Sequence, residues 1–389
     1  MPADFLKEHR NDDVNRLALL RNHYPSFSDS EWRWLLQQIE GRQRTINKLP
    51  ETAEKEDWWY PVRLSCEQCS GEQTALYKAN LIHRLYTENG LPTRHMADLT
   101  GGMGIDCLYM SRLFDTADYV EQDTELCRLA EHNFGLYSPN IRVICGSAEE
   151  RLTTDGFAAN LIYLDPARRN LNGGKVFRIE DCRPDILRLL PALRARAGLL
   201  LFKLSPMLDL SAALQSLGGI WDCHVVATAN EVKEVLLMQD SARRLHGDIV
   251  AADTANGMRF VFRREEEQTA IAHYAEPMSY LYEPHSAILK AGAYKLAGKR
   301  FGLSKLDANT HLYTSERLAD DFPGRVFRIT GTGNKAAEGI RQANVVTRNY
   351  VLSADGLRKK LRLQDGGDTY IFGVRARNTP TLLVGERIK

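Results

Sequence analysis

Between residues 95 and 204, short apolar runs alternate with segments of amphipathic helical periodicity. The apolar runs are His95–Leu99, Tyr119–Glu121, Arg142–Cys145, Asn160–Leu164 and Gly198–Leu204. The helical segments between them are Ile105–Phe114, Thr124–Leu136 and Pro184–Arg196. This βαβ alternation predicts an α/β fold with a doubly wound, Rossmann-like parallel sheet, because crossover helices return the chain to the same edge of the sheet.

Two predicted hairpins follow the alternating region. The first joins His224–Ala229 to Val235–Gln239 and is expected to add an antiparallel strand at the end of the sheet. The second joins Asp248–Ala252 to Arg259–Arg263 through Asn256-Gly257, a strong hairpin turn signal.

The segments on either side have different patterns. Residues 1–92 show mainly helical spacing, whereas the region beyond residue 268 combines a predicted helix over Ser286–Lys299 with strand-like runs such as Tyr370–Val374. A chain of 389 residues is long enough for two or three domains. We expect a helical domain over residues 1–92, the sheet domain over 93–268, and an α+β domain over 269–389.

The composition favours a soluble protein of the cytoplasm. Hydrophobic residues make up 43% and charged residues 26% of the chain. No apolar run reaches the ~18 residues that a membrane helix needs, and the charged segment Met1–Asp13 lacks the apolar core of a signal peptide. Seven scattered cysteines are typical of free thiols in a reducing compartment. We therefore expect no membrane partner.

A glycine-rich turn after the first predicted strand is the motif most informative about chemistry. It reads Asp98-Leu99-Thr100-Gly101-Gly102-Met103-Gly104 and opens the next helix. Glycines allow a ligand to approach the backbone, and a helix N-terminus offers free N–H groups. Asp98, three residues before the first glycine, would repel a pyrophosphate and suits a cationic ligand. A tight turn without a ligand is the alternative interpretation.

Two further carboxylates follow predicted strands of the same sheet. Glu121 ends the second strand, where its side chain can accept hydrogen bonds from a ribose diol. Asp165-Pro166-Ala167-Arg168 closes the fourth strand and brings a carboxylate and a guanidinium to the same edge.

In this order, Asp98–Gly104, Glu121 and Asp165–Arg168 resemble the class I S-adenosylmethionine-dependent methyltransferases. The resemblance covers about residues 95–240. The longer strings Glu67-Gln68-Cys69-Ser70, Asp98–Asp106 and Asp165–Arg169, with the extra C-terminal region, look like a bacterial subgroup with a THUMP-like C-terminal domain. THUMP domains are RNA-binding modules, so the resemblance implies S-adenosylmethionine as cofactor and RNA, as tRNA or rRNA, as partner.

The resemblance also implies roles for individual residues. Asp98 and the turn formed by Thr100, Gly101, Gly102 and Gly104 would hold the methionine moiety of the cofactor, and Glu121 its ribose. Ser147 occupies the position of an adenine-contacting acid. Asp165 would lie at both the cofactor and the acceptor. Thr100 stands where glycine is commoner, and Gly101 is an additional glycine.

Residues after the fourth and fifth strands bear on the acceptor. Asp165 and Arg168 are the expected catalytic residues, and Arg168, Arg169 and Lys203 are the expected substrate contacts. Ala167 and Arg168 replace the second proline and the aromatic ring of amino-group methylases, and Arg168 can stack on a base or clamp a phosphate. Lys203-Leu204-Ser205-Pro206 lacks the cysteine nucleophile of uracil C5 methylases. Transfer to a base nitrogen is therefore preferred.

Several features keep two interpretations open. Cys66 and Cys69 suggest zinc, but no second pair follows at workable spacing, so we expect free thiols and no metal. Trp58-Trp59-Tyr60 could stack on bases, although packing against the sheet domain is favoured. Tyr77 and Lys78 either line a substrate entrance or pack against that domain.

The charge distribution favours RNA although the net charge of the chain is only +1. Residues 321–389 contain 13 Lys and Arg against six Asp and Glu, which leaves the first 320 residues at −6. A basic terminal segment is the expected footprint of phosphate-backbone binding. The alternatives are a non-catalytic RNA-binding protein with a degenerate cofactor fold, and a methyltransferase that acts on a small molecule or a protein. The sequence indicates no oligomeric state.

Overall fold

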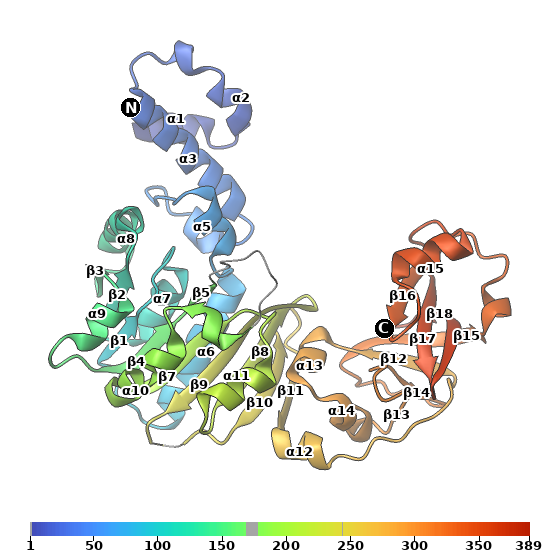
Figure 1. The fold of residues 1–389 in the computed structure, drawn as a ribbon. Coiled ribbons are helices and arrows are strands. Elements are labelled where there is room, and N and C mark those ends of the chain that lie inside the picture. Colours follow the sequence, from blue (N-terminus) through green and yellow to red (C-terminus); the bar gives the residue numbers. More distant parts are fainter. Residues whose placement is uncertain (1, 169–177, 243) are drawn as a thin grey trace. The chain divides into compact units, whose positions relative to one another are not determined.

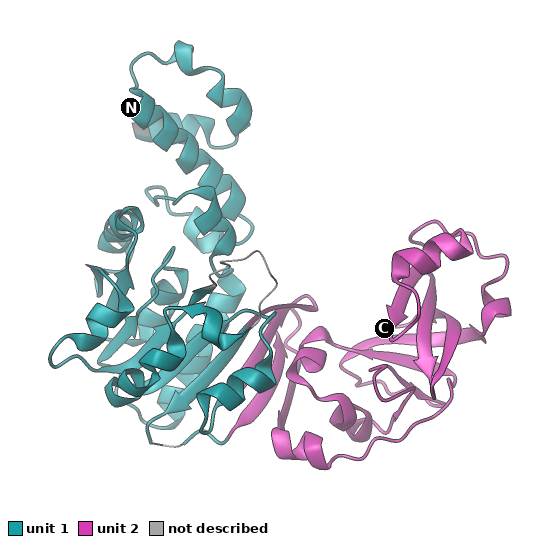
Figure 2. Cartoon of the chain, in the orientation of Figure 1, with its two compact units in different colours: residues 1–222, 235–246 teal, residues 223–234, 247–389 magenta. Residues whose placement is uncertain are grey.

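The computed structural model describes residues 2–168, 178–242 and 244–389 (Figure 1). The chain divides into two compact units, the first with residues 1–222 and 235–246 and the second with residues 223–234 and 247–389 (Figure 2). Each unit is described separately below.

The first unit begins with helices, in agreement with the mainly helical spacing of residues 1–92. They are α1 (Pro2–His9), α2 (Val14–Ala18), α3 (Asp29–Thr45), α4 (Pro50–Ala53), α5 (Arg63–Gln68) and α6 (Glu72–Glu88). Ser28 starts α3 with a capping box, in which its hydroxyl accepts from the backbone N–H of Glu31 while the Glu31 carboxylate accepts from the N–H of Ser28. Trp32, Leu35 and Ile39 form the buried face of this helix.

A sheet of the predicted α/β type makes up the rest of the first unit. Its strands are β1 (His95–Asp98), β2 (Thr116–Glu121), β3 (Ile141–Cys145), β4 (Ala159–Leu164), β7 (Ala197–Leu204) and β9 (Glu231–Asp240). The first four residues of β9 are assigned to the second unit. The accompanying helices are α7 (Ile105–Met110), α8 (Thr124–Tyr137), α9 (Ala148–Thr153), α10 (Ile186–Arg196) and α11 (Leu210–Leu217). The short strands β5 (Ala167–Arg168) and β6 (Cys182–Arg183) pair with each other.

The strand order confirms the doubly wound prediction. Within this unit the order is β9-β7-β4-β1-β2-β3, and the pairs β1–β2, β2–β3, β1–β4 and β4–β7 are parallel. β9 runs antiparallel to β7 and is therefore the antiparallel strand that the first predicted hairpin was expected to add. The chain leaves β1 toward β3 and then resumes at β4 on the other side of β1. Ligands of doubly wound sheets bind at such a switch point, beyond the carboxyl ends of the strands.

The second unit contains the predicted C-terminal α+β region. Its elements begin with β8 (Asp222–Thr228), β10 (Asp248–Asp253), β11 (Arg259–Arg263) and α12 (Arg264–Thr269). They continue with β12 (Tyr280–Pro284), α13 (Ser286–Ala291), α14 (Tyr294–Arg300), β13 (Ser304–Lys305) and β14 (Tyr313–Ser315). The last are β15 (Gly324–Thr332), β16 (Asn344–Arg348), α15 (Ala354–Leu361), β17 (Thr369–Ala376) and β18 (Thr379–Arg387). β10 and β11 form the predicted second hairpin.

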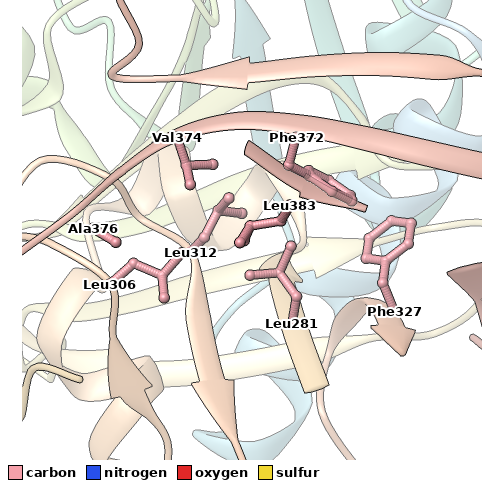
Figure 3. Packing of buried hydrophobic residues seen from close by; sticks show 8 residues of the cluster. All are labelled: Leu281, Leu306, Leu312, Phe327, Phe372, Val374, Ala376 and Leu383. Carbon is pink, nitrogen blue, oxygen red and sulfur yellow. The ribbon is translucent and has the colours of Figure 1, made fainter. Parts of the chain in front are cut away.

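A seven-stranded sheet with the order β13-β14-β12-β15-β18-β17-β16 dominates this unit. Buried side chains from its strands and connections form one cluster, which contains Leu281, Leu306, Leu312, Phe327, Phe372, Val374, Ala376 and Leu383 (Figure 3). The helix predicted over Ser286–Lys299 is divided into α13 and α14, because Gly292 ends α13 in a left-handed conformation with φ +86°.

Candidate functional site

The predicted carboxylates meet the glycine-rich turn at the switch point of the first unit. β1 ends at Asp98, and the following turn leads directly into α7. β4 lies beside β1, so Asp165, which follows β4, comes to the same edge. Thr100 joins the two segments, since its hydroxyl accepts a 2.6 Å hydrogen bond from the backbone N–H of Asp165. The structure therefore brings Asp98, Thr100 and Asp165 together.

Glycine is required at the positions of this turn for different physical reasons. Gly102 and Gly104 adopt left-handed backbone angles, with φ +58° and +79°, which side chains disfavour. Gly101 has no such angle, but a Cβ there would lie 2.3 Å from the ring of Tyr119. A Cβ at Gly104 would lie 2.6 Å from the ring of Phe134. Gly101 and Gly104 are thus required for packing of the turn on aromatic rings, whatever ligand lies above it.

Asp98 is a buried carboxyl in an acidic neighbourhood. Its side chain accepts a 3.0 Å hydrogen bond from the backbone N–H of Thr100, and only 1% of the residue is exposed. Burial is the main reason why the pKa of Asp98 is raised to about 8. The hydrogen bond from Thr100 lowers this pKa, whereas the negative charges of Asp106, Asp165 and Glu121 contribute to the rise. A cationic group placed beside Asp98 would offset the repulsion. This carboxyl therefore fits the positively charged cofactor that the resemblance implies.

Glu121 ties the end of β2 to the glycine-rich turn. One carboxylate oxygen accepts a 2.8 Å hydrogen bond from the N–H of Gly102, and the other accepts from the N–H groups of Gln122 and Asp123. These bonds orient the carboxylate at the carboxyl edge of the sheet. A ribose diol has two donors suited to it, and that role stays a prediction.

Ser147 is the N-cap of α9. Its hydroxyl accepts from the N–H of Glu150 at 3.1 Å, while the Glu150 carboxylate accepts from the N–H of Ser147 at 2.8 Å. The visible contacts of Ser147 are therefore those of a capping box. Contact with an adenine ring stays a prediction for this residue.

Lys203 lies near the end of β7 and forms an ion pair with Asp165. Its ammonium also donates to the hydroxyl of Ser70 at 3.1 Å and lies 3.6 Å from Asp106. The predicted substrate contact of Lys203 stays untested, whereas its contact with Asp165 is direct. The backbone of Arg168 pairs with Cys182 between β5 and β6, and Arg169 lies outside the described residues.

A buried charged cluster adjoins this ion pair, and the sequence patterns did not reveal it. Asp106 lies 3.1 Å from the ammonium of Lys78, whose side chain is fully buried. The hydroxyls of Ser70 and Tyr163 donate to Asp106 at 2.7 and 2.6 Å. Burial alone would raise the pKa of Asp106, but Lys78, Lys203 and these hydroxyl bonds lower it to about 2. Of the two alternatives for Lys78, the structure shows packing against the sheet domain.

The aromatic segment before α5 also packs against the sheet domain. The ring of Trp59 stacks on His132 of α8 with a 3.6 Å centroid separation, and the Arg128 guanidinium lies 5.3 Å from the Trp59 ring centroid. Asn133 holds both backbone groups of Trp59, accepting from its N–H at 2.8 Å and donating to its carbonyl at 2.9 Å. These contacts agree with the packing interpretation of the aromatic segment.

Comparisons with known proteins show the family of this chain. Proteins from two strains of Mycobacterium tuberculosis, each named an uncharacterized S-adenosylmethionine-dependent methyltransferase, are 22% identical over 346 residues, which is 85% of this chain and 89% of theirs. A solved structure from Porphyromonas gingivalis W83, assigned as a methyltransferase, is 32% identical and superimposes with a TM-score of 0.86. It covers 100% of this chain and 98% of its own. The chain belongs to the S-adenosylmethionine-dependent methyltransferases.

The methyltransferase carries two further domain matches in its second unit. Residues 280–323 match a ferredoxin-like domain model, and residues 324–387 match a THUMP domain-like model. The cofactor of this methyltransferase is S-adenosylmethionine. Among the described residues, no helix is long and apolar enough to cross a membrane. The same residues contain no group of three or more His, Cys, Asp or Glu side chains placed to hold a metal ion.

Proposed function

We propose that this methyltransferase transfers a methyl group to a base nitrogen in RNA, with tRNA or rRNA as the acceptor. The observation that carries the RNA assignment is the basic surface of the THUMP domain-like segment. Exposed side chains in this segment include Arg328, Lys335, Arg341, Lys359, Lys360, Arg362 and Arg377. Cations grouped in one module are what phosphate-backbone binding requires, and salt should weaken that binding.

The cofactor is proposed to lie along the carboxyl edge of β1 and β2. Asp98 would hold the cationic end of the cofactor, Glu121 its ribose, and the turn around Gly102 would allow close approach of the backbone. Thr100 and Gly104 maintain the shape of this turn, and Ser147 would border the adenine. When bound, S-adenosylmethionine supplies a methyl group that is already activated by its sulfonium.

Asp165 is proposed to position the acceptor. Its side chain remains 37% exposed, so a carboxylate oxygen can accept a hydrogen bond from the N–H of an incoming base. This bond would direct the nitrogen lone pair toward the methyl group, and the carboxylate would take up the proton that the nitrogen loses. Arg168 and Arg169 would bind the surrounding phosphate or base. The protein's contribution to catalysis is mainly orientation and exclusion of water.

The test uses methyl-labelled S-adenosylmethionine with RNA, protein and metabolite fractions from cells that lack the protein. Label in RNA is the expected result, and nucleoside analysis then identifies the modified base. Asp165→Asn should lower kcat by about 10²–10⁴-fold while cofactor binding persists. Label that appears only in the protein or metabolite fraction would contradict the RNA assignment. Full activity of Asp165→Asn would place the catalytic group elsewhere.

A further inference from the structure

We infer that Lys203 positions Asp165 for the methyl transfer, and that the helical segment before the sheet domain supplies the support that holds Lys203 in place. The inference deepens the proposed function and rests on the proposed role of Asp165. It concerns four buried or partly buried side chains behind that carboxylate: Ser70, Lys78, Asp106 and Lys203.

Exposure decreases stepwise from Asp165 into the protein. The side chain of Asp165 is 37% exposed, that of Lys203 13%, that of Asp106 8% and that of Lys78 0%. The Lys203 ammonium contacts Asp165 and also lies within reach of Asp106 and Ser70. An exposed carboxylate thus lies at the end of a buried chain of ion pairs, which restricts where its oxygens can point.

Positive and negative charges are equal in number along this row of ion pairs. Two ammonium groups, from Lys78 and Lys203, face two carboxylates, from Asp106 and Asp165. Lys203 lies between both carboxylates, so its ammonium is drawn toward Asp106 as well as toward Asp165. The Ser70 hydroxyl links two members of the network, because it donates to Asp106 and accepts from Lys203. Each charged member thus has a partner of opposite charge, and such a connected network favours a single arrangement of its members.

Stability is a weak reason for burying the charges of Lys78, Asp106 and Lys203 at this place. The cost of removing charges from water often equals or exceeds their mutual attraction, and apolar side chains of similar volume would stabilise a core at least as well. A buried network that ends at an exposed carboxylate on the ligand-binding edge is better explained by the orientation it gives to Asp165. Misplacement of a reacting group by about 1 Å can cost about 10²-fold in rate.

The network also explains a role of the N-terminal helices. Ser70 lies between α5 and α6, and Lys78 lies on α6, whereas Asp106 and Lys203 come from α7 and β7. The contacts therefore cross from the helical segment to the sheet within the first unit. Without α6 and the turn before it, Lys203 and Asp106 would lack their contacts with Ser70 and Lys78.

The test compares Lys203→Met, Lys203→Arg and Ser70→Ala in the full chain, with Lys7→Met as the control at an exposed lysine. Each variant is checked by thermal unfolding and by calorimetric binding of S-adenosylmethionine, and initial rates are then measured with labelled cofactor and RNA. Lys203→Met should lower kcat by about 10²-fold, with the RNA KM and cofactor Kd within about threefold of wild type. Lys203→Arg should recover part of this loss, because its guanidinium still pairs with a carboxylate.

Ser70→Ala should give a smaller loss in kcat, about 10-fold, because it removes the hydrogen bonds to Asp106 and Lys203 but no charge. A Lys203→Met variant that binds cofactor and keeps wild-type kcat would overturn the inference. A loss expressed only in KM would also overturn it, since that pattern belongs to a direct substrate contact. If wild type labels a fraction other than RNA, the RNA assignment fails, and the same kcat comparison on that acceptor still decides the role of Lys203.

Discussion

Binding of S-adenosylmethionine should depend steeply on pH because of Asp98. The carboxyl is buried and has a pKa of about 8, so it is mostly protonated at pH 7 in the free protein. A cationic cofactor beside it favours the ionised form, and binding should therefore release a proton. Cofactor binding is measured between pH 6 and pH 8, with Asp98→Asn as the matched variant that cannot ionise at this position.

The magnitude follows from the ionised fraction. With a pKa of about 8, about one Asp98 in 100 is ionised at pH 6, and about half are ionised at pH 8. If the ionised form binds the cofactor, the apparent affinity should rise by about 50-fold over this range, or about 2 kcal/mol. The folding stability of the free protein should instead fall as pH rises from 6 to 8. A carboxyl whose folded pKa is raised stabilises the fold below its unfolded pKa and loses that contribution as pH rises toward 8.

Calorimetry in two buffers of different ionisation enthalpy measures both affinity and proton release. Wild type should release close to one proton at pH 7, and Asp98→Asn should release less and bind more weakly at pH 8. The variant also corrects for the amino group of the cofactor, which titrates in the same range. An affinity that varies less than about threefold between pH 6 and 8, or an equal pH dependence in Asp98→Asn, would show that Asp98 does not ionise on cofactor binding.

Three further variants test the packing and the RNA surface. Gly101→Ala should destabilise the first unit by about 1–3 kcal/mol, because its methyl group meets the Tyr119 ring; denaturant unfolding measures the loss, and unchanged stability would contradict the contact. Asn133→Ala should cost about 2–4 kcal/mol in the same assay, because two hydrogen bonds to the N-terminal segment are lost. An exposed substitution, Asn11→Ala, is the control. Replacing Lys359 and Lys360 together by alanine should weaken RNA binding and flatten its salt dependence, whereas an unchanged salt slope would place the phosphate contacts elsewhere.

The edge of the sheet was predictable because it depends on local order along the chain. Each of Asp98, Glu121 and Asp165 ends or follows an apolar run, and parallel strands bring such positions to one edge without any knowledge of side-chain packing. The positive φ angles of Gly102 and Gly104 belong to the same local geometry. The charge excess of residues 321–389 was likewise readable from composition.

Other features depend on contacts between distant segments. Ser70 meets Asp106 across 36 positions and Lys203 across 133, and helical periodicity shows only that α6 has a buried face. It does not show what that face meets.

Gly101 illustrates the same limit within the motif itself. As a glycine next to a ligand-binding turn it is naturally assigned to the cofactor, yet its missing Cβ makes room for Tyr119 of β2, 18 positions away. A glycine motif therefore combines two requirements, space for the ligand above the turn and space for the core beneath it. Only the structure separates them: Gly101 faces the core, and the open side of the turn at Gly102 is where cofactor contact should be tested.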